Sequence, residues 1–138
     1  MVPPTTPGIA GVLADYDRLV EVGIGNRTTV ARTLVDRGVS VRATDVVDRA
    51  VPTDVAFVRD DVRRPDEAVY ADAEAIYALR LPPELQRPAW RVARSVGADF
   101  LFTTLGGDPA LVPAEPRTVV EGTLYVSAHT GGSRPATD

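Results

Sequence analysis

Residues 18–28 read RLVEVGIGNRT, a run of five residues typical of a buried strand followed by a turn with two glycines. In residues 28–37 the apolar side chains recur at helical spacing, and Gly38 stands where a left-handed helix end belongs. A strand, a glycine turn and a helix in this order predict one unit of a parallel α/β sheet. Gly23 and Gly25 permit a tight turn, and we expect backbone N–H groups there to approach a ligand.

Strand-like and helix-like runs alternate on both sides of this unit. We expect strands at residues 39–44, 55–58, 74–79 and 99–104, and helices at residues 9–16 and 65–70. Pro88 would break a helix already running from Pro83, so the next regular helix is expected to begin near Pro88. Residues 106–116 are predicted to be loop. Residues 119–128 supply either one more strand or a tight pair bent at Gly122.

The predicted fold class is therefore α/β. We expect one three-layer, Rossmann-like domain over residues 1–128, with a mostly parallel sheet of five or six strands and helices on both faces. Residues 129–138 are predicted to form a flexible polar tail.

Composition excludes several classes of function. The chain has 138 residues, no cysteine and a net charge of −4, and all 15 of its basic residues are arginine. Without cysteine there is no disulfide, thiolate metal site or cysteine nucleophile, and we expect no bound metal. No apolar stretch is long enough to span a membrane, and the expected location is the cytoplasm. The acidic balance argues against general nucleic-acid binding. An exposed edge strand would be compatible with a homodimer.

The glycine turn fits two ligand classes incompletely. The dinucleotide fingerprint G-x-G-x-x-G needs a third glycine where Thr28 stands. The pattern acidic-x-G-x-G-x-G of methyltransferases that use S-adenosylmethionine (SAM) needs it where Arg27 stands. Glu21 favours SAM, because a carboxylate suits its cationic methionine end and would repel a pyrophosphate. The alternative is a strand-to-helix turn without a ligand.

Acidic residues follow the next two predicted strands. Asp45 ends the strand at 39–44, at the distance from the glycines where a carboxylate accepts hydrogen bonds from ribose hydroxyls in NAD or SAM sites. Asp60, Asp61 and Val62 follow the third strand, where SAM-binding domains place an acid on the adenine amino group and an apolar residue beside the ring. The alternatives are a loop cap at Asp45 and a solvated turn at 60–61.

The segment ALRLPPE, residues 78–84, leaves the fourth predicted strand at the edge where open α/β sheets bind ligands. Arg80, Pro82 and Pro83 are candidates to face a substrate, and Arg80 could hold a carboxylate or phosphate. An ion pair of Arg80 with an acidic neighbour is the alternative. His129, the single histidine, is expected to be a surface residue without a chemical role.

Together, EVGIGNRT, ATD, RDDV and YALRLPPEL, in this order over residues 12–112, resemble uncharacterised protein family 0146. This small archaeal group has a Rossmann-like fold related to SAM-dependent methyltransferases, so the resemblance implies a reduced methyltransferase-like domain. It implies that the methionine part of SAM lies against Glu21, Gly23, Gly25 and Asn26, with Asp45 on the ribose and Asp60 or Asp61 with Val62 on the adenine.

The expected cofactor is SAM, with NAD as the alternative. Methyl transfer to an unidentified acceptor is the leading hypothesis for function. The alternative is a non-catalytic nucleotide-binding domain, binding SAM or NAD, that acts as a sensor or regulator.

Overall fold

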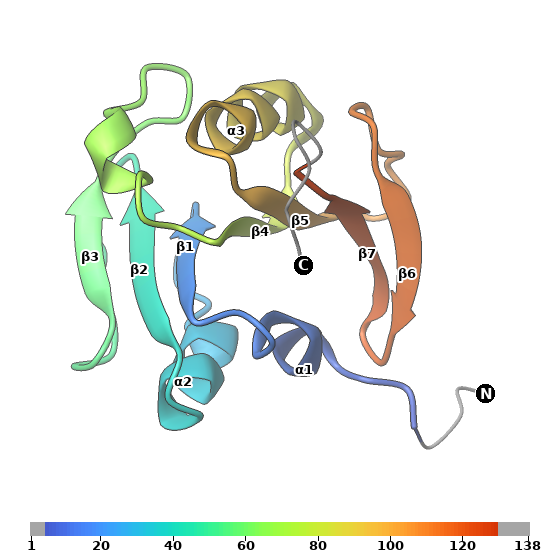
Figure 1. Ribbon diagram of the computed structural model, residues 1–138, viewed down its shortest axis with the longest axis horizontal. Helices are drawn as coiled ribbons and strands as arrows, with labels where there is room; N and C mark the ends of the chain where they lie inside the picture. The colour runs from blue at the N-terminus through green and yellow to red at the C-terminus, as the bar shows by residue number, and fades with distance from the viewer. Residues whose placement is uncertain (1–4, 130–138) are drawn as a thin grey trace.

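Seven strands form one sheet in the computed structural model, which describes residues 5–129 (Figure 1). The order across the sheet is β3-β2-β1-β4-β5-β7-β6. The first five strands are parallel, and β7 runs antiparallel to both β5 and β6. The strands are β1 Arg18–Val22, β2 Ser40–Asp45, β3 Ala56–Arg59, β4 Ala75–Leu81, β5 Asp99–Thr104, β6 Glu115–Val119 and β7 Gly122–Ser127.

Helices cover both faces of this sheet, which confirms the predicted three-layer α/β class. Helices α1 (Ile9–Leu13) and α2 (Thr29–Asp36) lie on one face, and α3 (Pro83–Val96) lies on the other (Figure 1). The short 3-10 helix η1 (Glu67–Val69) packs on the α3 side through Val69. Among the described residues, no helix is long and apolar enough to cross a membrane.

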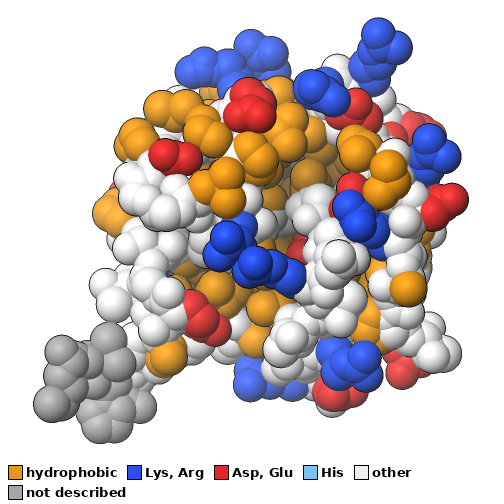
Figure 2. Space-filling view, turned by 180° about the vertical axis from the view of Figure 1, so that it is seen from behind, with side chains coloured by type: hydrophobic (Ala, Val, Ile, Leu, Met, Phe, Trp, Pro, Cys, Tyr) orange, Lys and Arg blue, Asp and Glu red, His pale blue; other side chains and the backbone are white. Residues whose placement is uncertain are grey.

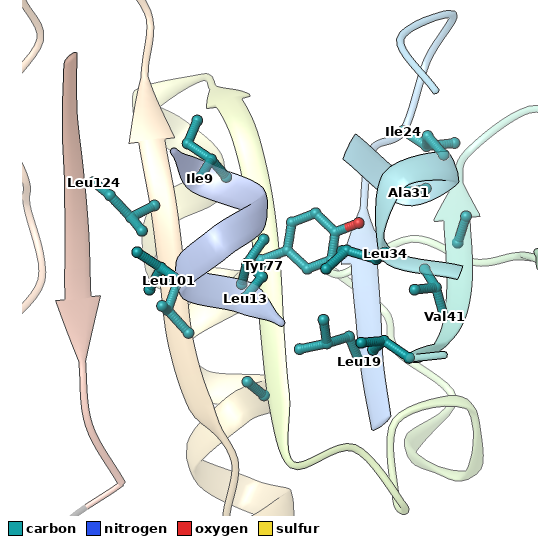
Figure 3. Close-up of a cluster of buried hydrophobic side chains, with 14 of the residues drawn as sticks. Ile9, Leu13, Leu19, Ile24, Ala31, Leu34, Val41, Tyr77, Leu101 and Leu124 are labelled. Atoms are coloured by element: carbon teal, nitrogen blue, oxygen red, sulfur yellow. The ribbon is translucent and has the colours of Figure 1, made fainter. Parts of the chain in front are cut away.

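Two hydrophobic cores result, one on each face. Successive side chains of a strand point to opposite faces, so Leu19 of β1 enters the α1–α2 core while Val20 and Val22 enter the α3 core. Figure 3 shows the Tyr77 ring among Leu13 and Leu34 in the first of these cores. Glu21 follows the same alternation as Leu19, and a carboxyl group is therefore buried with apolar side chains.

Helix α3 begins five residues before the predicted start, and Pro88 lies inside it. The prediction that Pro88 would prevent a helix from Pro83 is wrong, because tertiary contacts hold the first turns in place. Gln86 is fully buried, donates its side-chain amide to the Pro109 carbonyl (3.0 Å) and accepts the Leu111 N–H (2.6 Å). These bonds and the buried face of the helix outweigh the hydrogen bond that proline cannot make.

The sheet has more strands than the five or six expected, because residues 115–127 form a hairpin. Of the two alternatives for residues 119–128, the tight pair is the closer one, with Val119 paired to Gly122 across a two-residue turn. The first strand of the pair begins at Glu115, within the stretch predicted to be loop. Pro116 is accommodated in it because β6 is an edge strand, where a missing N–H is tolerated.

The predicted tail starts at His129 and otherwise lies outside the described residues. His129 itself is half-buried, and its backbone N–H donates to Asp99 at the start of β5 (2.7 Å). The chain is therefore held to the sheet at least as far as this residue.

Candidate functional site

The strand order reverses between β1 and β4, which continue to opposite sides of the sheet. In open α/β sheets, ligands bind at such a switch point, outside the carboxyl ends of the strands. The glycine turn leaves β1 there, and Leu79 and Arg80 lie beside it near the carboxyl end of β4. Three adjoining pockets follow this edge.

We name the pockets by their most distinctive walls. The carboxylate pocket, about 270 Å³, lies beside the ends of β2 and β3 and is lined by Val22, Gly23, Asp45, Val46, Asp60, Asp61, Val62, Arg63, Glu84 and Leu85. The glycine-loop pocket, about 170 Å³, lies at the switch point and is lined by Glu21, Gly23, Ile24, Gly25, Asn26, Arg27, Leu79, Arg80 and Leu105.

The hairpin pocket, about 880 Å³, is bounded by the start of α2, the ends of β4 and β5, and the β6–β7 hairpin. It shares Asn26, Arg27, Leu79 and Arg80 with the glycine-loop pocket, which shares Gly23 with the carboxylate pocket. The face seen in Figure 2 is hollowed near its centre, with hydrophobic side chains at depth and arginines across the opening.

The glycine turn is held by β2 rather than open to a ligand. Gly23 and Ile24 donate their N–H groups to the Thr44 carbonyl (2.9 and 3.0 Å), and Gly25 donates to the Asp45 carboxylate (2.8 Å). The expectation that these N–H groups approach a ligand is therefore wrong. Gly23 has φ +71°, and a Cβ there would meet no atom within 4 Å, because that space is open pocket. Glycine at this position suits the left-handed backbone, which residues with a side chain rarely adopt.

Asp45 ends β2, as predicted, and its carboxylate already has three donors. Besides Gly25, Val46 donates its N–H (2.7 Å) and Arg49 its Nε (3.2 Å). Asp45 is only 8% exposed and lines the carboxylate pocket. A carboxylate has about four acceptor positions, so one remains open, and a second would open if Arg49 moved away.

Asp60 and Asp61 lie beside Asp45, and both have protein partners. Asp60 accepts the Tyr70 hydroxyl (2.6 Å) and a backbone N–H. Asp61 is paired with Arg63 (3.3 Å), whose hydrogen bonds lower the pKa of this carboxyl. Val62 is buried and forms an apolar part of the pocket wall.

Glu21 borders the glycine-loop pocket but is 1% exposed. Its carboxyl accepts the Tyr77 hydroxyl (2.7 Å). Burial raises the pKa of Glu21 to about 8, although the hydrogen bond from Tyr77 acts in the opposite direction. Glu21 is therefore mostly protonated at pH 7, and the negative charge that favoured a cationic ligand in the sequence analysis is largely absent before a ligand binds.

Arg80 has an unusual backbone for a residue with a side chain. Its φ is +54°, at an irregularity in the pairing of β4 with β5 between Ala78 and Leu81. Its N–H donates to the Thr103 hydroxyl oxygen (2.7 Å). Its side chain is exposed and borders both the glycine-loop and hairpin pockets. The ion pair considered for Arg80 does not form with any acidic residue in the part of the chain that the structure describes.

Pro82 and Pro83 line none of the three pockets. Pro82 is the N-cap of α3 and Pro83 its first residue, where a missing N–H costs nothing. The structure therefore gives these two prolines a place in starting α3.

Several lining residues were not singled out from the sequence. The sequence patterns treat Arg27 only as the residue in place of a third glycine, although an arginine in such a turn can itself indicate a binding site. Thr103 and Thr104 place two hydroxyls after the apolar residues 100–102, and this change from apolar to polar could have indicated that they line a pocket. Glu121 lines the hairpin pocket from the β6–β7 turn, and no local sequence pattern predicts that position.

Within residues 5–129, no three His, Asp or Glu side chains gather as metal ligands would.

A family model described as "Uncharacterised protein family (UPF0146)" matches residues 6–130. The chain belongs to this family. A UPF0146 protein of Halobacterium salinarum is 55% identical over 122 residues, covering 88% of this chain and 95% of the relative. The resemblance drawn from the four sequence motifs is thus confirmed.

Among solved structures, the chain is similar to an RNA methyltransferase from Salinibacter ruber in complex with S-adenosylhomocysteine. The TM-score is 0.62 at 17% identity, over 94% of this chain and 93% of that one. The antibiotic-resistance methyltransferase Kmr gives a TM-score of 0.58 at 15% identity, over 84% and 87% of the two chains. At these identities the likeness shows the fold, which is Rossmann-like and related to methyltransferases.

Proposed function

We propose that the chain binds SAM along the carboxyl edge of the sheet and transfers its methyl group to an acceptor in the hairpin pocket. The observation that carries this proposal is the row of three adjoining pockets across the switch point. A nucleoside would occupy the carboxylate pocket, the methionine part the glycine-loop pocket, and the acceptor the hairpin pocket. The methyltransferase-like fold supports this assignment.

The residues of the first two pockets fit SAM in size and chemistry. The open space at Gly23 admits a ligand against the backbone. Asp45 would accept the ribose hydroxyls, one at its open acceptor position and one in place of Arg49. Val62 would pack against the adenine ring, with Asp60 or Asp61 near its amino group. Asn26, beside Gly25, would face the methionine part.

The same geometry disfavours NAD. A pyrophosphate is held in Rossmann domains by backbone N–H groups of the glycine turn and by the helix behind it. Here the N–H groups of Gly23, Ile24 and Gly25 are all bound to β2. The pocket next to them is lined by four carboxylates, Asp45, Asp60, Asp61 and Glu84, which would repel a phosphate.

When bound, SAM supplies an electrophilic methyl group on a sulfonium. The contribution of this chain is to hold the acceptor in line with that group and to receive the proton that the acceptor loses. Two carboxylates face the hairpin pocket, Asp108 and Glu121. Glu121 accepts the Ile9 N–H through one oxygen (2.9 Å), which leaves its other oxygen for a proton.

The binding test is calorimetric titration with SAM, S-adenosylhomocysteine, NAD and ATP. We expect both sulfur nucleosides to bind, and Asp45→Asn to weaken them by roughly tenfold, about 1.4 kcal/mol. The control is Asp48→Asn, at an exposed position of the same loop that lines no described pocket. Equal or tighter binding of NAD, or unchanged binding to Asp45→Asn, would contradict the assignment.

A second measurement separates enzyme from sensor. The chain is incubated with SAM carrying a radiolabelled methyl group and with fractions of archaeal small-molecule extract. Label recovered in a product, and lost with Arg80→Gln, would support methyl transfer. Tight SAM binding without any labelled product would favour the regulatory alternative.

A further inference from the structure

Two arginine side chains stand where the glycine-loop and hairpin pockets meet. Arg27 and Arg80 line both pockets and are exposed. Within residues 5–129, neither guanidinium makes a hydrogen bond or an ion pair. Other arginines near acidic groups are paired, as Arg49 is with Asp45 and Arg63 with Asp61. Two positive groups thus converge on a cavity without a protein counter-ion.

We propose that Arg27 and Arg80 bind an anionic group of the acceptor, so that the methyl-accepting substrate is a small molecule with a carboxylate or a phosphate. This inference rests on the proposed function. Guanidinium groups suit both anions, because their planar N–H donors match two oxygens at once.

The backbone at Arg80 supports this role. A residue with a Cβ is strained at φ +54°, and within residues 5–129 the Arg80 guanidinium makes no hydrogen bond or ion pair that would explain why the residue is not glycine. The strain is maintained by the bond from its N–H to Thr103. Strained backbone of this kind concentrates at functional sites. Here it coincides with the irregularity between Ala78 and Leu81 in the pairing of β4 with β5, beside the two pockets that Arg80 lines.

Further donors surround the pair. The Thr103 hydroxyl accepts from Arg80, which leaves its own proton to donate, and Thr103 lines the hairpin pocket. Thr29 and Val30, the first residues of α2, line the same pocket. The side chain of the N-cap residue Thr28 makes no hydrogen bond to the backbone N–H groups of α2. The partly positive N-terminus of α2 therefore has no side-chain cap.

The acidic groups of the pocket limit what the anion can be attached to. Asp108 and Glu121 line the hairpin pocket together with the arginines, and the whole chain has a net charge of −4. A polyanion such as RNA would meet repulsion around the two arginines. A compact acceptor, anionic at one end and carrying at the other a cationic group that loses its proton before it attacks the methyl group, matches both signs of charge.

The test titrates the protein with inorganic phosphate and with malonate at constant ionic strength, with and without saturating S-adenosylhomocysteine. We expect binding in the millimolar range, at least about fivefold weaker in Arg27→Gln and in Arg80→Gln. Arg32→Gln is the matched control, because Arg32 is exposed on α2 and lines no described pocket. Tighter binding of phosphate than malonate would indicate a phosphorylated acceptor, and the reverse a carboxylate.

Affinity for S-adenosylhomocysteine is measured on the same variants and should stay within about twofold of the wild type. Anion binding that is equal in all variants would overturn the proposal. A tenfold loss of S-adenosylhomocysteine affinity would also overturn it, because the arginines would then hold the carboxylate of the cofactor. Arginine-dependent binding of an RNA oligonucleotide more tightly than phosphate would overturn the small-molecule class. Arginine-dependent anion binding by a protein that does not bind S-adenosylhomocysteine at all would leave the anion site standing and refute the proposed function.

Discussion

The two ends of the pocket row differ in how their charged side chains are satisfied. In the carboxylate pocket, Asp45, Asp60 and Asp61 each have donors from the protein itself. At the border of the hairpin pocket, the guanidinium groups of Arg27 and Arg80 have no acceptor among the described residues. A ligand of the first end must exchange one set of hydrogen bonds for another, whereas a ligand of the second end meets groups that only water solvates. We therefore expect that removing a protein partner such as Arg49 strengthens ligand binding at the first end, whereas removing Arg27 or Arg80 weakens it at the second.

The largest effect is expected at Glu21, which borders the glycine-loop pocket between the two ends and is 1% exposed. Its pKa is about 8 when folded and near 4.5 when exposed. Between these values the unfolded chain releases a proton that the folded chain keeps, so stability is lost as pH rises from 4.5 to 8. The loss relative to Glu21→Gln should be on the order of 4 kcal/mol.

Urea unfolding of the wild type and Glu21→Gln at pH 5, 7 and 8.5 measures this difference. Glu115→Gln is the control, because Glu115 is exposed on the edge strand β6. A difference between the wild type and Glu21→Gln that does not change with pH would show that Glu21 is ionised in the fold.

The next effect concerns the glycine turn. Gly23→Ala places a methyl group in the open space between two pockets and should weaken S-adenosylhomocysteine by at least about tenfold. Gly38→Ala is a matched control, since Gly38 also has positive φ and no atom within 4 Å of a Cβ, but lines no pocket. Both should lose about 1–2 kcal/mol of stability from backbone strain. Equal losses of affinity would mean that strain, not occupied space, governs binding.

A gain of affinity is expected from Arg49→Gln. Arg49 Nε lies 3.2 Å from Asp45 Oδ2, where it competes with the ribose for this carboxylate. In Arg49→Gln, ribose binding no longer has to displace the arginine. Affinity for S-adenosylhomocysteine should rise by about three- to tenfold. Arg59→Gln serves as the control, because Arg59 donates only to the Val46 carbonyl. Weaker binding by Arg49→Gln would show that Arg49 contacts the ligand itself.

The smallest effect tests strain at the unsatisfied end. Arg80→Gly relieves the left-handed backbone and removes no hydrogen bond or ion pair of the described residues, so it should stabilise the fold by about 0.5–1 kcal/mol. Arg80→Gln keeps the strain and should leave stability within about 0.5 kcal/mol of the wild type. Urea unfolding of both variants decides this, and a destabilised Arg80→Gly would mean that the arginine side chain holds the fold.

The fold could be predicted largely because its signals are local. Strands β1 and β5 begin and end at the residues expected, since each is an apolar run bounded by turn residues. Glu21, the two glycines and Asp45 could be assigned to one edge because parallel strands end together. The β6–β7 hairpin was only half anticipated, because its first strand contains a proline tolerated only at an edge.

The internal partners could not be predicted. Tyr77 reaches Glu21 across 56 residues, and Gln86 reaches the 109–111 loop across about 24. Such pairs depend on side-chain directions and strand register, which appear only after folding. For the same reason, the sequence suggested a charged Glu21 and ligand-facing glycine N–H groups, whereas burial raises the pKa of Glu21 to about 8 and the glycine turn is hydrogen-bonded to β2.

A crystal structure with S-adenosylhomocysteine bound would show directly whether the nucleoside lies in the carboxylate pocket. We expect the ribose hydroxyls on the Asp45 carboxylate, the adenine against Val62, and Arg49 turned away from Asp45. A nucleoside bound elsewhere, with Arg49 still paired to Asp45 and the pockets filled by the protein's own side chains, would contradict it.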